Sequence, residues 1–78
     1  MDNELDLVRR AHSGDREAFE GLVREYARIV WAHVYGMVHD RAWTEDLVQE
    51  TFMRAWESIG DLKDPAAFRG WLFTIARR

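Results

Sequence analysis

The chain has 78 residues, 47% of them hydrophobic, which is enough for one small domain with a single core. It has no cysteine, which excludes disulfides and thiolate chemistry, and its net charge of −3 argues against general nucleic-acid binding. No signal peptide opens the chain, and no apolar run approaches the roughly 20 residues that span a bilayer. We therefore expect a cytoplasmic protein that makes no membrane contact.

A short first helix is predicted to start after Asp2 or Asn3. Its apolar residues recur at helical spacing and are Leu5, Leu7, Val8 and Ala11. Gly14 fits the end of this helix, because glycine readily adopts the left-handed backbone conformation that stops a helix. Asp15 can then cap the helix that follows.

The second helix is predicted from Arg16 to about Val38. Its apolar residues follow the i, i+3, i+4, i+7 pattern of a helix with one buried stripe. The stripe consists of Phe19, Leu22, Val23, Tyr26, Ile29, Val30, His33, Val34 and Met37. We interpret His33 as a structural histidine with satisfied hydrogen bonds. Trp31 and Tyr35, four positions apart, are interpreted as packing residues.

A third helix is predicted from Thr44 to about Ser58. Thr44 is a good N-cap, and the two acidic residues that follow it would interact favourably with the helix dipole. Trp43, just before this start, is interpreted as a residue that packs between helices. Gly60 ends the helix and opens the loop GDLKD.

The fourth helix is predicted to begin at Asp64 and Pro65, because proline is tolerated at the first helical position. It carries Phe68, Trp71, Leu72 and Ile75 at helical spacing and is still helical in pattern at Arg78. No C-cap follows, so we expect a fragment that ends within or just after a helix. The predicted fold class is all-α, a compact bundle of about four helices in one domain, residues 1–78.

The third helix has two stripes that both follow i+3 and i+4 spacing. The apolar stripe is predicted to face the core and comprises Leu47, Val48, Thr51, Phe52, Ala55 and Ile59. The second stripe mixes acids, an amide and a methionine, and comprises Asp46, Gln49, Glu50, Met53 and Glu57. Spacing alone leaves two interpretations open for it. It is either a solvated face or a docking surface for a basic partner, with Met53 as an adaptable apolar contact.

Three segments occur in a specific order along the chain: GDREAFEGLVREY, TEDLVQETFMRAW and FRGWLFTIARR. At these distances they closely resemble region two of extracytoplasmic-function (ECF) sigma factors, the small bacterial transcription-initiation factors of the sigma-70 family. The resemblance covers nearly the whole chain, from about Leu5 to Arg78. It implies a helical domain that binds the core RNA polymerase clamp and opens promoter DNA. The second domain of such factors, which reads the upstream promoter element, would lie outside this fragment.

The resemblance also implies roles for particular residues. Contact with the coiled-coil clamp helices of the largest polymerase subunit would be made by Asp46, Gln49, Glu50 and Met53, with Arg54 and Glu57 at the edge. The non-template single strand of the minus-ten promoter element would be held by Lys63, Asp64, Ala66, Arg69, Trp71, Arg77 and Arg78. All 14 acidic residues precede Pro65, whereas three arginines follow it. This distribution fits an acidic face for the protein partner and a basic end for DNA.

Some positions depart from the family's pattern or allow two interpretations. Arg78 stands where the family often has an asparagine suited to a base edge, and arginine binds guanine and phosphates alike, so base preference is left open. Trp43 and Thr44 stand where the family usually has smaller or acidic residues. Trp71 is either a partly exposed ring that stacks on DNA or a member of a core stripe with Phe68.

No enzyme is predicted, because the chain shows no nucleophile–base pair, glycine-rich phosphate loop or carboxylate pair in an evident pocket. Neither a cofactor nor a small-molecule substrate is therefore expected. His12, His33 and His39 lack metal-ligand spacing, so no metal site is expected. The alternative function is a helical protein-interaction module without direct DNA capture. Under the sigma-factor interpretation, too, an inhibitory anti-sigma factor could cover the same surfaces.

Overall fold

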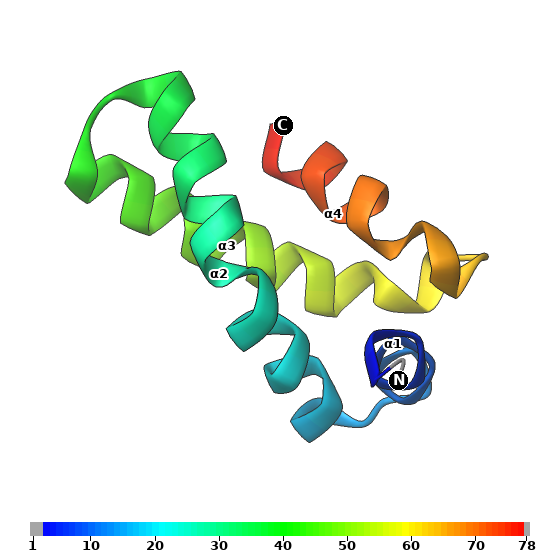
Figure 1. Ribbon diagram of the computed structural model, residues 1–78. Coiled ribbons are helices and arrows are strands. Elements are labelled where there is room, and N and C mark those ends of the chain that lie inside the picture. The colour runs from blue at the N-terminus through cyan, green and yellow to red at the C-terminus, as the bar shows by residue number, and fades with distance from the viewer. Residues whose placement is uncertain (1–2, 78) are drawn as a thin grey trace.

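The computed structural model describes residues 3–77 of the chain. Four α-helices follow one another within this range: α1 (Asn3–His12), α2 (Arg16–Val38), α3 (Arg41–Ser58) and α4 (Phe68–Arg77). Two short 3-10 turns, η1 (Ile59–Asp61) and η2 (Pro65–Ala67), lie between α3 and α4. Figure 1 shows α2 and α3 crossing as a long hairpin, with α4 returning alongside. The prediction of an all-α bundle is confirmed.

Two left-handed residues end the first two helices. Gly14 has a φ of 103° and follows α1, after which the Asp15 carboxylate accepts a hydrogen bond from the Ala18 N–H at 3.2 Å and caps α2. This hydrogen bond is the main cause of a lowered pKa at Asp15. His39 has a φ of 55°, and its N–H donates to the Tyr35 carbonyl at 2.8 Å. The predicted bounds of α2 are confirmed.

The start of α3 differs from the prediction that placed it at Thr44. Asp40 is the N-cap, and its carboxylate accepts the Trp43 N–H at 2.8 Å. Thr44 is buried inside the helix, where its Oγ1 donates to the Asp40 carbonyl at 2.6 Å. The physical reason is that Asp40 directly follows the left-handed His39 and so is the first residue able to cap a new helix. The acids at positions 45 and 46 therefore lie beyond the first turn.

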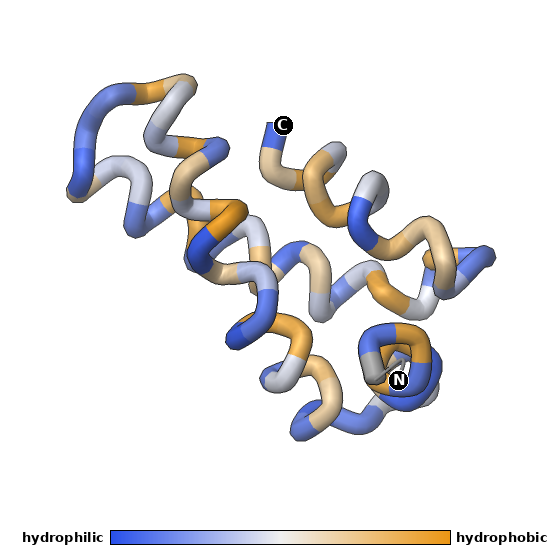
Figure 2. The backbone as a smooth tube through the Cα atoms, in the orientation of Figure 1, coloured by the Kyte–Doolittle hydropathy of each residue, from blue (hydrophilic) through white to orange (hydrophobic). Residues whose placement is uncertain are grey.

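The core is formed by one side of each helix, and Figure 2 shows apolar and polar residues interspersed along every one of them. Its apolar members are Val8, Ala11, Ala18, Phe19, Leu22, Tyr26, Val30, Val34, Phe52, Ala55, Ile59, Leu62, Phe68 and Leu72. The predicted apolar stripe of α3 is confirmed, with Leu47 and Val48 only partly buried.

Four residues that were expected to pack are exposed instead: Ile29, Tyr35, Met37 and Trp43. Trp43 is 55% exposed, so its interpretation as a residue that packs between helices is wrong. Ile29 and Met37 lie in the second half of α2, which at 23 residues is much longer than the 10-residue helices α1 and α4. Short neighbours cannot cover the whole apolar stripe of a long helix.

Contacts between helices are mostly apolar, with one polar link between α1 and α2. The Tyr26 hydroxyl donates to the Glu4 carboxylate, with both oxygens at 2.9 Å. The ion pairs found within residues 3–77 are all exposed and join positions at most five apart: Arg10 with Asp6 and Asp15, Arg16 with Glu20, and Arg54 with Glu50. No helix in the described part of the chain is both long and apolar enough to cross a membrane.

Candidate functional site

The second stripe of α3 forms a hollow on the surface of the protein. Its volume is about 350 Å³, and it is lined by Asp46, Gln49, Glu50, Met53, Arg54 and Glu57, all of them exposed. We call this surface the α3 hollow. The structure therefore brings together the six residues that were assigned to polymerase contact. Whether they make that contact remains a prediction.

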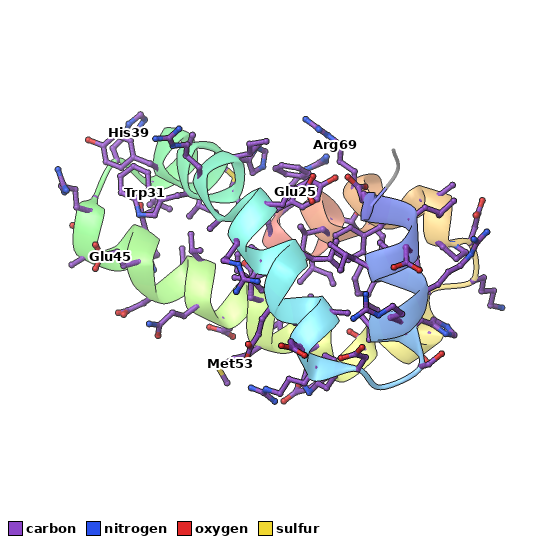
Figure 3. All side chains as sticks on the ribbon, turned by 60° about the horizontal axis from the view of Figure 1, so that its bottom comes forward. Glu25, Trp31, His39, Glu45, Met53 and Arg69 are labelled. Carbon is purple, nitrogen blue, oxygen red and sulfur yellow. The ribbon has the colours of Figure 1, made fainter. Side chains whose placement is uncertain are left out.

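The α3 hollow presents both charge and an apolar side chain. Glu50 pairs with Arg54 across one helical turn at 2.6 Å, so this carboxylate is already partly neutralised. Asp46 and Glu57 form no ion pair within residues 3–77. Met53 is 62% exposed, and Figure 3 shows it projecting outward from α3. Such a surface can bind a basic helix that also carries apolar side chains.

An apolar groove lies next to the hollow, between α2 and the middle of α3. Its volume is about 550 Å³, and it shares Gln49, Met53 and Glu57 with the α3 hollow. The other lining residues are Arg16, Phe19, Glu20, Val23, Ala27, Val48, Phe52 and Trp56. We call it the α2–α3 groove. Sequence reasoning missed it, because a groove between two helices depends on how they pack and not on the spacing within either one.

Trp56 forms one end of the α2–α3 groove and is held by two α2 residues. Its ring lies 5.2 Å from the Phe19 ring, and the Arg16 guanidinium lies over it at 5.5 Å. The sequence did carry a signal for it, since Trp56 is spaced between the apolar and polar stripes of α3. A large ring at such a boundary is often half-buried, as Trp56 is here.

The residues assigned to DNA contact lie in two parts of the chain. Lys63, Asp64 and Ala66 lie at the turn that contains η2, and the others within residues 3–77 lie on α4. The Asp64 carboxylate accepts the Ala66 N–H at 3.0 Å and so caps η2, as predicted for a residue before Pro65. Lys63, Asp64 and Ala66 are all exposed at this turn. Because the Asp64 carboxylate already accepts this hydrogen bond, Asp64 would contribute to DNA contact through the conformation of the turn that it caps.

Arg69 is exposed and held between two aromatic rings. Its guanidinium carbon lies 6.0 Å from the Tyr26 ring and 5.8 Å from the Phe73 ring. These contacts fix the side chain by cation–π attraction while leaving its charge without an ion pair in residues 3–77. Figure 3 shows Arg69 projecting away from the helices, on the side of the molecule opposite Met53. Arg69 is therefore well placed to bind a phosphate.

Trp71 and Arg77 complete the described part of this segment. Trp71 is half-buried, with its ring 5.8 Å from Phe68, whereas Phe68 and Leu72 are fully buried. Part of the Trp71 ring thus remains available for stacking. Arg77 is exposed in the last turn of α4, roughly 12 Å along the axis from Arg69. Arg78 lies outside the described residues.

Two further groups were examined for chemistry. The centres of the His33 and Phe73 rings are 5.2 Å apart. His33 Nε2 is buried with no hydrogen-bond partner within the described residues, so the prediction of a satisfied histidine is wrong. The reason is that an apolar ring of α4, and not a polar group, covers this position. Nowhere in residues 3–77 do three metal-ligating side chains gather.

Comparison with known proteins gives a consistent result. The family described as Sigma-70 region 2 matches residues 22–78. RNA polymerase sigma-H factor of Pseudomonas aeruginosa is 33% identical over 97% of this chain and 39% of its own length. ECF RNA polymerase sigma factor BldN of Streptomyces coelicolor is 40% identical over 94% of this chain and 28% of its own length. ECF RNA polymerase sigma factor SigL of Mycobacterium tuberculosis is 41% identical, over 90% and 40% respectively. The chain thus spans two fifths or less of the length of these relatives.

Proposed function

The chain belongs to the sigma-70 region 2 family, and from this premise we propose that it is the polymerase-binding and promoter-opening domain of an ECF sigma factor. The family is one of transcription initiation factors and not of enzymes. The observation that carries the proposal is the gathering of six exposed α3 residues in one hollow beside an apolar groove. This proposal makes core RNA polymerase and promoter DNA the two partners.

On the protein side, the α3 hollow would bind the clamp helices of the largest polymerase subunit. Asp46 and Glu57 would pair with basic side chains of that partner, and Gln49 would donate and accept hydrogen bonds at the centre. The α2–α3 groove would accept apolar side chains from the same partner, because its lining is mainly aliphatic and aromatic. An inhibitory anti-sigma factor that covered the same surface would compete with polymerase.

On the DNA side, the segment from Lys63 to Arg78 would hold the non-template single strand of the minus-ten element. Arg69 and Arg77 would bind phosphates, and the exposed part of Trp71 would stack on an unpaired base. No covalent chemistry is needed, since binding of unstacked bases itself favours the open strand. With three or four cationic groups available, the logarithm of the affinity should fall with the logarithm of salt with a slope of roughly −2 to −3.

Docking can be tested by replacing the centre of the α3 hollow. The double variant Gln49→Ala/Glu50→Ala should weaken binding to core RNA polymerase by about tenfold or more, because interface energy concentrates in central residues. Glu25→Ala is a matched control, since it removes one exposed negative charge from the side of α2 shown in Figure 3 near Arg69. Circular dichroism should show unchanged helicity in both proteins. Equal polymerase affinity of the double variant and the parent chain would mean that the face is only solvated.

DNA capture can be tested by fluorescence anisotropy with single-stranded oligonucleotides, with core polymerase present. A minus-ten-like sequence should bind more tightly than a scrambled one, and the triple variant Lys63→Ala/Arg77→Ala/Arg78→Ala should lose most of this binding. If polymerase binds but neither sequence preference nor loss in the variant is seen, the alternative of a protein-interaction module is favoured instead.

A further inference from the structure

From Arg24 to its C-cap His39, α2 carries aromatic and basic residues on the side away from α4. His33 marks the side that meets α4, through its contact with Phe73, and Tyr35 lies roughly 200° further round the helix. A run of residues three or four positions apart forms this other side: Arg24, Arg28, Trp31, Tyr35 and His39. We call it the outer α2 face. None of the interactions proposed above uses it.

The aromatic residues of this face form an ordered stack. The Trp31 and Tyr35 rings are 5.1 Å apart and nearly parallel, with an angle of 10° between them. The His39 ring meets Tyr35 edge-on at 6.1 Å. Figure 3 shows Trp31 and His39 together near the α2–α3 turn, well away from Met53 and Arg69. Tyr35 covers one face of the Trp31 ring, and the Trp31 side chain as a whole is half-buried.

Burial of this face is not needed for the fold. Tyr35 is 37% exposed, and Trp43, four residues beyond His39, is 55% exposed and contacts no other aromatic ring in the described part of the chain. Arg24 and Arg28 are exposed and form no ion pair or side-chain hydrogen bond within residues 3–77. Exposed aromatic rings and arginines without ion pairs are the groups that a single strand of nucleic acid can use for stacking and phosphate contact.

The charge of this face is opposite to that of the α3 hollow. Residues 26–39 contain no acid, in a chain that has 14, and Arg28 is the one arginine among them. Glu25 and Asp40 directly adjoin this stretch, and Arg24 and Arg41 are the next residues on either side. A basic protein partner suits the α3 hollow, whereas an anionic partner suits the outer α2 face.

We propose that the outer α2 face, together with Trp43, is a second binding surface for single-stranded nucleic acid. Such a strand offers phosphates to Arg24 and Arg28 and flat bases to the exposed Trp43 ring and to the exposed part of the Trp31–Tyr35 stack. An acidic polypeptide could pair with the two arginines, but its carboxylates would not stack on exposed indole rings. The proposal goes beyond capture of the minus-ten element, because this face and the Arg69 side lie on opposite sides of α2.

Stacking on aromatic rings is tolerant of base sequence, so this contact should not depend on a promoter motif. The suitable probe is fluorescent oligo(dT) of about twelve nucleotides, titrated into the free domain and followed by anisotropy. Arg28→Gln should weaken binding about fivefold and reduce the magnitude of the salt slope by roughly 0.7, the value for one lost phosphate contact on a single strand. Arg9→Gln is the matched control, since it makes the same charge change on α1, and it should alter the affinity by less than about twofold.

Trp43 tests the stacking part of the proposal. Trp43→Ala should weaken oligo(dT) binding by about fivefold or more, and Trp43→Phe should recover part of that loss because it restores a flat ring. Helicity measured by circular dichroism should be the same in both variants, since Trp43 is exposed. Equal losses in Trp43→Ala and Trp43→Phe would overturn the stacking role.

Two other outcomes would overturn the proposal while leaving the proposed function intact. If Arg28→Gln and Arg9→Gln have equal effects while Lys63→Ala weakens oligo(dT) binding, the strand is held by the α4 side alone. If a glutamate-rich peptide of matched length binds as tightly as oligo(dT) and is equally sensitive to Trp43→Ala, the partner is an acidic polypeptide. The proposed function fails separately, through the Gln49 and Glu50 variants and the minus-ten oligonucleotide.

Discussion

The α3 hollow and the segment from Lys63 to Arg77 are built in different ways. All six residues of the hollow lie on one helix, and their exposure follows from the period of that helix. The second segment passes from an extended stretch through η2 into α4. Its position is set by contacts with other helices: Phe68 and Arg69 both contact the Tyr26 ring, and Phe73 contacts His33.

This difference shows which parts of a small domain depend on its tertiary structure. The hollow requires only that α3 is helical, whereas the second segment requires α1, α2 and α3 to be in place behind it. Substitutions of buried residues in and behind the second segment should therefore lower stability most. Substitutions on the exposed face of α3 should lower it least. The following experiments test that contrast, from the largest expected effect to the smallest.

The largest effect is expected at Phe68, the fully buried residue at the start of α4. Phe68→Ala should lower the free energy of unfolding by about 3–5 kcal/mol, through lost burial and the cavity that remains. Urea denaturation followed by circular dichroism measures this change. Met53→Ala, on the exposed face of α3, is the control and should cost less than about 0.5 kcal/mol. Similar costs at the two sites would contradict the contrast between the two regions.

A smaller effect is expected at high pH, through Tyr26. Burial, together with the hydrogen bond to the Glu4 carboxylate, raises the pKa of Tyr26 to about 12, above the usual value of 10.0. The unfolded chain therefore loses this proton at lower pH than the folded chain does. The contribution of Tyr26 to the free energy of unfolding should be constant below pH 10. It should fall as the pH rises from about 10 to about 12.

Denaturation across this pH range checks the Tyr26 prediction. Tyr26→Phe should remove this part of the pH dependence, because the titrating hydroxyl is gone. Tyr35→Phe is the matched control, and it should keep the pH dependence, since Tyr35 is exposed. If Tyr35→Phe removed the pH dependence of stability and Tyr26→Phe did not, the hydrogen bond between Tyr26 and Glu4 would not be its cause.

The stability of the protein should depend on the Asp40 side chain at the start of α3 and much less on that of Asp46. Asp40→Ala removes the N-cap hydrogen bond and should lower the free energy of unfolding by about 1 kcal/mol. Asp46→Ala removes an equal charge from the second turn and should cost less than about 0.5 kcal/mol. Thermal unfolding of the two variants provides the measurement. The reverse order would mean that α3 starts near Thr44 after all.

The smallest change is expected at His33 and has the opposite sign. Its Nε2 is buried without a hydrogen-bond partner in the described residues, so His33→Leu should raise the free energy of unfolding by up to about 1 kcal/mol at neutral pH. His12→Leu, at an exposed position, should leave stability within about 0.5 kcal/mol. Loss of stability in His33→Leu would show that the imidazole makes a polar contact that the apolar side chain cannot replace.

Much of the fold could be predicted from local signals. The end of α1 and the start of α2 could be predicted from Gly14 and Asp15. The two faces of α3 could be predicted from helical periodicity. Both features depend only on residues that are close in sequence. The start of α3 could not be predicted from Thr44, since Asp40 offered an equally good cap four residues earlier. Choosing between two caps requires knowing that His39 turns left-handed.

The sites were less predictable where they depend on packing between helices. The α2–α3 groove arises from Val23 and Ala27 facing Val48, and no spacing within one helix reveals it. Likewise, the exposure of Trp43 and the apolar cover over His33 are set by where the helices stop and cross. The roles of the α3 hollow and of the Lys63–Arg78 segment rest on the resemblance to sigma factors and stay predictions.

The local character of the ion pairs has a practical consequence for such measurements. No ion pair within residues 3–77 joins α2, α3 or α4 to another of these helices, and those that exist are exposed. Raising the ionic strength from 0.05 to about 0.5 M should therefore leave the unfolding transition nearly unchanged, because exposed pairs contribute little. Contacts with polymerase and nucleic acid would weaken over the same range. Salt can thus serve as a reversible way to weaken the proposed contacts of this domain without unfolding it.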